Sequence, residues 1–186
     1  MINKVKENIR FLSEKSIFSP NCSALTDEEW QDVIRVFILD YQRYYTIEFD
    51  VEKVKYFPGL LATFFYRISR KLYLKGDENN ALEFSSLGFF LTGIEIYYSA
   101  QIGKALKINH GIGTIIGSRT ELGDNVLLHH SVTLGEKNGG RARLGNHVTV
   151  YPGAILVGDI FIGSNSIIGA NVFVDKSYPE NSKIYK

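Results

Sequence analysis

An apolar residue recurs at every sixth position through the second half of the chain. The longest uninterrupted series is Leu144, Val150, Leu156, Ile162, Ile168 and Val174, and shorter series are Ile96, Ile102 and Ile108, and Leu122, Leu128 and Leu134. This period matches neither the α-helical turn of about 3.6 residues nor a heptad, so a helix would spread these side chains around its axis. A coiled β-solenoid instead stacks them into one inward-facing column, and neighbouring coils bury one another's apolar faces.

A second column of inward side chains accompanies the first. Four residues after many of the repeated positions the chain carries a smaller or apolar residue, namely Val126, Val132, Val148, Ala154, Ile160, Ser166 and Val172. Each six-residue unit therefore supplies one large and one smaller inward side chain, with a turn between them. The sequence predicts a stack of such units.

The composition changes near residue 94. All four histidines and most of the glycines lie after that point, whereas most of the aromatic residues lie before it. In the first part, Thr26 and Glu29 form a capping box, and a helix is predicted after it. Two more helices are predicted, from Leu60 to Leu74, with Pro58 allowed in the first turn, and over 80–90. We therefore predict an α+β chain, with a helical N-terminal domain over 1–93 and a parallel β-solenoid over 94–186.

The helical part is unusually rich in aromatic residues. Because a domain of this size has a small core, we expect many of them to lie at a subunit interface or against the solenoid. The residues in question are Tyr41, Tyr44, Tyr45, Phe49, Tyr56, Phe57, Phe64, Phe65 and Tyr66.

Charge and cysteine content narrow the possible environments. The net charge of +1 gives no strong field for nucleic acid or for an anionic membrane, so we expect neither as a partner. The single cysteine, Cys22, allows no internal disulfide and fits a reducing compartment. The N-terminus lacks the apolar stretch of a secretion signal, and no apolar run is long enough to span a bilayer. We expect a cytoplasmic protein.

Two irregular segments interrupt the six-residue repeat. Two residues are inserted around Gly111–Gly113, and a longer loop is inserted between Leu134 and Leu144, with a Gly139–Gly140 pair and two arginines. A regular stack carries such loops at little cost, and loops of this kind often bind ligands. We interpret the longer loop as a flexible cover over an anionic ligand, the alternative being a plain solvated loop.

Several motifs make the chain similar to the serine acetyltransferase family of hexapeptide-repeat acyltransferases. They are Gly93-Ile94-Glu95-Ile96, Ala100-Gln101-Ile102-Gly103, Asn109-His110-Gly111-Ile112-Gly113 and His130-Ser131-Val132-Thr133-Leu134-Gly135, behind a helical N-terminal region. The resemblance implies a left-handed parallel β-helix with an N-terminal helical domain. It also implies assembly into homotrimers, or dimers of trimers, with active sites between neighbouring solenoids.

The resemblance implies acetyl transfer from acetyl-CoA to a small-molecule hydroxyl acceptor, as in the conversion of L-serine to O-acetylserine for cysteine biosynthesis. His110 matches the catalytic histidine of the family, and Glu95 matches the carboxylate that orients it. An imidazole can take the hydroxyl proton during attack on the thioester because its pKa lies near neutrality. A carboxylate on the other ring nitrogen fixes the tautomer.

The remaining site predictions concern the substrate and the cofactor. Asn109, His130 and Arg141 are predicted to contact the acceptor; His130 follows Leu128 by the same two residues as His110 follows Ile108, which places it one coil away on the same outer face. A structural role for His130 remains equally open. By resemblance, acetyl-CoA would lie along Gly135, Gly139, Gly140, Arg143, Gly153, Ala154, Gly169 and Ala170.

The sequence also departs from the family pattern. Asn109 and Tyr44 stand where serine-specific members carry Asp, and Gly140-Arg141-Ala142 replaces an Arg-His-Pro motif. These changes leave open an alternative acceptor, a sugar or another small alcohol. The family's long tail is replaced by residues 182–186, so docking to cysteine synthase is not expected.

Two other classes of protein remain as rivals. A solenoid with histidines can bind zinc, and His110, His130 and His147 are the candidate ligands, although His147 is out of register with the other two. No metal is expected under the main hypothesis. The second rival is a scaffold without catalytic activity.

Overall fold

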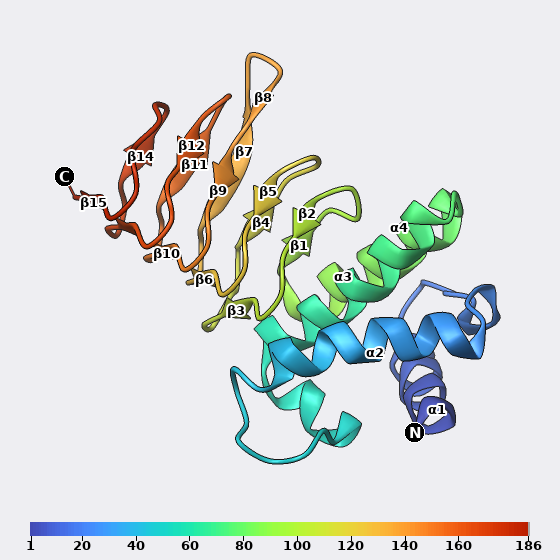
Figure 1. Cartoon of the computed structure of the whole chain (residues 1–186). Coiled ribbons are helices and arrows are strands. Elements are labelled where there is room, and N and C mark those ends of the chain that lie inside the picture. The colour runs from blue at the N-terminus through green and yellow to red at the C-terminus, as the bar shows by residue number, and fades with distance from the viewer. Residues whose placement is uncertain (186) are drawn as a thin grey trace.

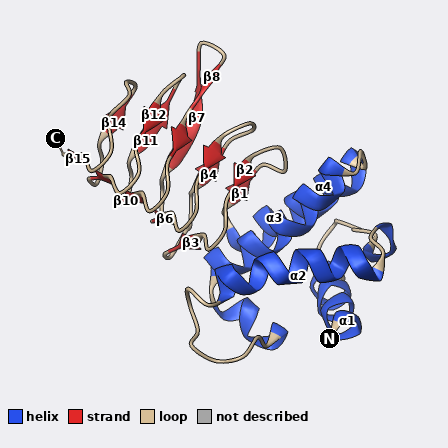
Figure 2. Cartoon of the chain, in the orientation of Figure 1, coloured by secondary structure: helices blue, strands red, loops and turns tan. Residues whose placement is uncertain are grey.

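The computed structural model describes residues 1–185, and Lys186 lies outside them. A group of helices is followed by a solenoid of short strands (Figures 1 and 2), which confirms the predicted fold class. The last helix ends at Thr92 and the first strand begins at Glu95. We keep 1–93 and 94–186 as the proposed domain division. Within residues 1–185, none of the helices has the length and apolar character that crossing a membrane requires.

Four α-helices form the N-terminal part: α1 (Ile2–Ser13), α2 (Asp27–Tyr41), α3 (Pro58–Leu74) and α4 (Glu78–Thr92), with short 3-10 helices η1 (Cys22–Ala24) and η2 (Val51–Tyr56). The predicted capping box begins α2, since the Glu29 amide donates to the Thr26 hydroxyl at 3.3 Å and the Thr26 amide donates to the Glu29 carboxylate at 2.8 Å. Helix α3 begins at Pro58, where the missing amide hydrogen costs nothing.

The aromatic residues of the helical part are better buried than the sequence suggested. Tyr41, Phe64, Phe65 and Tyr66 are all within the core, together with Trp30 and Phe37. The expectation of a subunit interface or of packing against the solenoid was wrong for Tyr41, Phe64 and Phe65, which lie in the helical core, whereas Tyr66 packs against the solenoid as expected. The reason is edge-on and tilted ring packing, as in the Phe37–Phe64 pair at 4.8 Å, which fills a small core efficiently.

The solenoid strands stack into three parallel sheets, one on each side of the coil. Sheet A contains β1 (Glu95–Ile96), β4 (Ile115–Ile116), β7 (Thr133–Lys137), β11 (Ile155–Val157) and β14 (Phe173–Val174). Sheet B contains β2 (Gln101–Ile102), β5 (Glu121–Leu122), β9 (Arg143–Leu144) and β12 (Phe161–Ile162). Sheet C contains β3 (Lys107–Ile108), β6 (Leu127–Leu128), β10 (Thr149–Val150), β13 (Ile167–Ile168) and β15 (Lys183–Ile184).

The six-residue repeat supplies the inward side chains, as predicted. Each residue of the series from Leu144 to Val174 is the second residue of its strand and is buried, and the smaller second column, Ala154 and Ser166 included, is buried as well. The loop between Leu134 and Leu144 is an antiparallel hairpin of β7 and β8 (Gly140–Arg141), which projects from the coil in Figure 1.

Helical side chains close the open end of the solenoid. Arg67 on α3 binds the buried Asp40 with two hydrogen bonds of 2.8 and 2.9 Å and also donates to the carbonyl oxygens of Ile102 and Gly103. Tyr66 donates to the Ala100 carbonyl oxygen at 2.8 Å and accepts from the Ile102 amide at 3.1 Å. These bonds satisfy backbone groups of the first coil that have no strand beside them.

Candidate active site

The turn Asn109–Gly113, which we call the His110 corner, joins β3 of sheet C to β4 of sheet A. His110 has a φ of 61° and Gly111 and Gly113 also have positive φ, so the two-residue insertion is accommodated as a compact left-handed turn. The Gly113 amide donates to the Gly93 carbonyl oxygen at 2.9 Å, which ties the turn to the start of the solenoid. The His110 side chain is exposed at this corner.

The helical part holds the His110 corner from the other side. The Tyr44 hydroxyl donates to the Ile108 carbonyl oxygen at 2.9 Å and accepts from the Ile108 amide at 2.8 Å. Burial raises the pKa of the Tyr44 phenol, so the hydroxyl stays protonated. Gly59 allows this approach, because a Cβ there would lie 2.8 Å from the Cβ of Ile108 and 2.9 Å from the Tyr44 hydroxyl.

A cavity of about 330 Å³ lies beside His110. One wall comes from the solenoid and the other from the turn before α3 and the segment after α2; the lining residues are Tyr44, Tyr56, Phe57, Pro58, Gly59, Lys107, Ile108, Asn109 and His110. Two of the predicted site residues, Asn109 and His110, thus share one cavity. Its volume is at the lower end of the range for small-molecule sites.

Glu95 lies on β1 at the same end of the solenoid. Its backbone is paired with Ile115, five positions after His110, and its side chain is half-buried. In the described part of the chain the carboxylate makes no hydrogen bond or ion pair, so the proposed contact with the His110 ring is not formed in this structure. Glu95 nevertheless lies on the end strand of sheet A, and the strand paired with it, β4, is the one that follows the His110 corner.

The position of His130 one coil from His110 on the same outer face stays a prediction. The register pairs Ile108 with Leu128, but the insertion makes the two corners differ: His110 has a φ of 61°, whereas the positive φ of the next corner is at Ser131, whose amide donates to the Ile112 carbonyl oxygen. The His130 ring is 3.5 Å from the Ser131 hydroxyl. Its neighbour His129 stacks on Tyr151 at 5.1 Å, and burial, with the nearby His130 and His110, lowers the pKa of His129.

The hairpin residues lie at a different corner of the coil. Arg141, predicted to contact the acceptor, donates to the Ser118 carbonyl oxygen at 2.8 Å and pairs with Glu136 at 3.4 Å. Its guanidinium is therefore bound by the preceding coil and by its own hairpin. Gly135, Gly139 and Gly140 belong to the same hairpin, between sheets A and B, whereas the His110 corner lies between sheets C and A.

Four of the predicted cofactor residues belong to turns in the same stack as His110. Gly153 and Ala154 follow β10, and Gly169 and Ala170 follow β13. The Gly153 amide donates to the His130 carbonyl oxygen at 3.1 Å. Ala154 is fully buried, because it occupies the inward second column, so its side chain faces the core and not a ligand.

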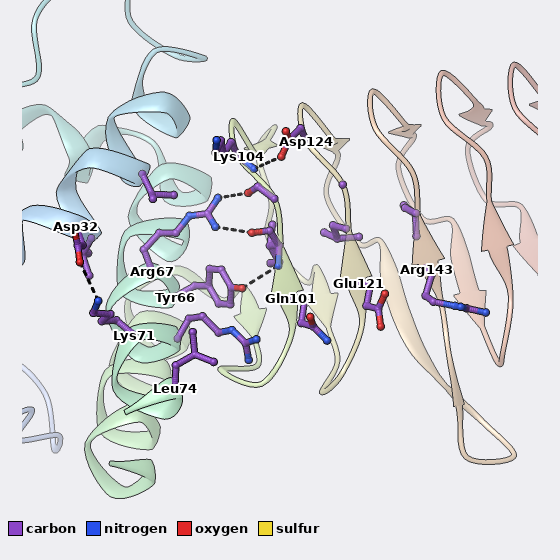
Figure 3. Close-up of a pocket in the computed structure, with 18 of the residues that line it drawn as sticks. Asp32, Tyr66, Arg67, Lys71, Leu74, Gln101, Lys104, Glu121, Asp124 and Arg143 are labelled. Atoms are coloured by element: carbon purple, nitrogen blue, oxygen red, sulfur yellow. Dashed lines mark hydrogen bonds and ion pairs between the residues drawn. The ribbon is translucent and has the colours of Figure 1, made fainter. Parts of the chain in front are cut away.

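Arg143 lies on sheet B, in a second and larger cavity of about 800 Å³ between that sheet and helices α2 and α3. Figure 3 shows Gln101, Glu121 and Arg143 in a row along this side of the solenoid, with Gln101 at the end nearer to Leu74 on α3 and Arg143 at the far end. Arg143 pairs there with Asp159 at 3.0 Å. Within one chain it is not brought together with His110.

The histidines do not form a metal site in this structure. His147 lies at the corner between sheets B and C, where its amide donates to the Asp124 carbonyl oxygen. Among residues 1–185, no three His, Cys, Asp or Glu side chains come together in a group that could hold a metal ion.

Sequence reasoning missed several residues that line the cavity. Tyr56, Phe57 and Gly59 reach it only through the docking of the helical part, which no local pattern reveals. Lys107 could have been found, since strand alternation places it on the outer face two positions before Asn109.

Comparison with known proteins gives a consistent result. No protein-family model matches the chain. A serine acetyltransferase from Helicobacter pylori is 41% identical over 130 residues, covering 68% of this chain and 76% of the relative. One from Staphylococcus aureus is 38% identical over 138 residues, covering 72% of this chain and 65% of the relative.

Solved structures agree with these relatives. Serine acetyltransferase isoform 3 from Entamoeba histolytica, in complex with cysteine, superposes with a TM-score of 0.78 at 25% identity, over 86% of this chain and 60% of that one. The Neisseria gonorrhoeae enzyme in complex with serine gives 0.74 at 28% identity, over 88% and 70%. The fold and these relatives together define a β-helical acyltransferase. The chain belongs to the serine acetyltransferase family, whose members use acetyl-CoA.

Proposed function

We propose that the protein transfers the acetyl group of acetyl-CoA to the hydroxyl of L-serine, with His110 as the general base. The observation that carries the proposal is the cavity beside His110, which combines an exposed imidazole with polar lining from Asn109 in a chain 41% identical to a serine acetyltransferase. The relatives favour serine over the alternative acceptors, a sugar or another alcohol.

The proposed reaction is a single acyl transfer. His110 takes the hydroxyl proton of serine while the oxygen attacks the thioester carbonyl carbon. The C–S bond then breaks, and the leaving coenzyme A thiolate takes that proton from the His110 imidazolium, which restores the base. The products are O-acetylserine and free coenzyme A. Glu95 is proposed to orient the imidazole once ligands close the site, since hydrogen bonds in a free enzyme often tighten only with substrate bound.

We also propose that the functional unit is a homotrimer or a dimer of trimers. The β7–β8 hairpin lies at one corner of the coil and the His110 corner at another, so one copy cannot bring both to the same acetyl-CoA. Gly135, Gly139 and Gly140 would then contact a cofactor shared with a neighbouring copy, while Gly153, Gly169 and Ala170 would line it on the His110 side. The cytoplasmic location stays a prediction.

The test is an acceptor panel. Purified protein is incubated with acetyl-CoA and either L-serine, a set of sugars or glycerol, and both thiol release and the acetylated product are measured. We expect O-acetylserine with L-serine and at most background thiol release with the other acceptors. Turnover with a sugar and none with serine would refute the serine assignment.

A further inference from the structure

The cavity beside His110 contains a cationic side chain that no acidic group neutralises. Lys107 lines it, and its lining residues include neither Asp nor Glu. Within residues 1–185, the Lys107 ammonium forms no ion pair; it lies 5.2 Å from the ring centre of Tyr44. Lys55, which lies over the ring of Tyr56 in the same lining, is already paired with Glu52 at 3.5 Å.

The backbone directs Lys107 toward the reacting centre. Side chains alternate along a strand, so Lys107 and Asn109 lie on the outer side of the coil while Ile108 between them is buried. His110 follows at the corner. An ammonium, an amide and an imidazole therefore form one wall of the cavity, and Tyr56 and Phe57 belong to the opposite wall.

An ammonium that lines a cavity without a counterion favours an anionic ligand. Charge-assisted hydrogen bonds between an ammonium and a carboxylate are shorter and stronger than neutral ones. A neutral sugar in this cavity would leave Lys107 without a partner, whereas an amino acid presents a carboxylate a few bonds from its hydroxyl.

We propose that Lys107 is the specificity residue that binds the carboxylate of the acceptor, so that this site selects hydroxyl acceptors that carry a carboxylate. The proposal rests on the proposed function and adds the chemical group that the acceptor must have. It also explains how the chain can recognise an amino acid although Asn109 and Tyr44 replace acidic residues that the family pattern carries.

The test removes the carboxylate from the substrate and the ammonium from the enzyme, singly and together. Initial rates of thiol release are measured with L-serine and with L-serinamide, which keeps the hydroxyl and the amino group. For the unmodified protein we expect kcat/KM for serinamide to be lower by about 10- to 100-fold. In Lys107→Gln we expect kcat/KM for L-serine to fall by about the same factor, through a higher KM. The kcat/KM of this variant for L-serinamide should be close to that of the unmodified protein.

Two control variants separate binding from folding. Lys107→Arg keeps a cation and should keep most of the preference for L-serine over L-serinamide. Lys183 lies on the same sheet at its far edge and is exposed, so Lys183→Gln should leave both acceptors unaffected. The KM for acetyl-CoA should be the same in all variants.

The outcomes distinguish the two proposals. Equal use of serine and serinamide by the unmodified protein, or an equal rise in KM for both in Lys107→Gln, would overturn the role of Lys107 while leaving serine acetylation intact. Turnover of neither acceptor would refute the proposed function, and the role of Lys107 with it.

Discussion

His129 shows how a single residue beside the site responds to its surroundings. It is half-buried, its ring is parallel to that of Tyr151 within 10°, and it lies next to His130 and His110. Burial, and secondarily the positive charge that the other two histidines carry when protonated, lowers its pKa below the ordinary value of 6.5. The folded protein therefore favours the neutral imidazole.

This lowered pKa predicts a loss of stability in mild acid. Above pH 6.5 His129 is neutral in both the folded and the unfolded chain; as the pH falls through 6.5 and then through the folded pKa, the unfolded chain takes up a proton first, which favours unfolding. Urea unfolding is measured for the unmodified protein and for His129→Gln at pH values from about 8 to 5. The free energy of unfolding should fall less with pH in the variant. Parallel losses in both proteins would contradict the assignment.

At the scale of the elements, the corners between sheets B and C determine how closely the coils stack. Glycines at 103, 123, 145 and 163 each lie against the backbone of the next coil. A Cβ on Gly145 would lie 2.6 Å from the Ser164 hydroxyl and 2.7 Å from the Ser164 amide nitrogen. Since the second of these atoms is backbone, the coils themselves would have to move apart.

Gly145→Ala should therefore destabilise the solenoid. We expect a loss of about 1–3 kcal/mol in the free energy of unfolding, the usual cost of overpacking a close contact. Chemical denaturation followed by circular dichroism measures it, with Lys104→Ala, an exposed position at an equivalent corner, as the control. If Gly145→Ala were as stable as that control, the close packing of the coils would be refuted.

The elements also show which parts of this protein can be predicted from sequence. The repeat from Leu144 to Val174 predicts the coils because every inward position is filled by a neighbouring coil in the same register. Helix α1 has apolar residues at Ile2, Val5, Ile9 and Leu12, a helical spacing from which this helix can be predicted as well. The pairing of Ile108 with Leu128, two positions before His110 and His130, followed from local spacing. The Tyr56–Gly59 wall did not, because it depends on contacts between distant segments.

At the scale of the whole molecule, one buried ion pair joins the helical part to the solenoid. Arg67 and Asp40 are both buried, and Asp40 also accepts from the Leu106 amide at 2.8 Å. Together with Tyr44 and Tyr66 they satisfy backbone groups of the first coil from Ala100 to Ile108. The position of the His110 corner relative to the aromatic wall therefore depends on this docking.

Arg67→Met should lower the free energy of unfolding of the protein, because it leaves the Asp40 carboxylate buried without its partner. Removing one member of a buried pair costs about 3–5 kcal/mol. Arg35→Met is a suitable control: Arg35 pairs with Asp32 at 3.2 Å but is 75% exposed, so its loss should cost less than about 1 kcal/mol. Equal thermal midpoints for the two variants would contradict the proposed docking.

The proposed chemistry requires an imidazole at the corner between sheets C and A. The most direct measurement is the steady-state rate of thiol release from acetyl-CoA with L-serine, for the unmodified protein and for His110→Asn. Loss of a general base predicts a fall in kcat of about a hundredfold or more, with the fold and acetyl-CoA binding retained. A variant that turns over serine at the unmodified rate would remove His110 from the reaction.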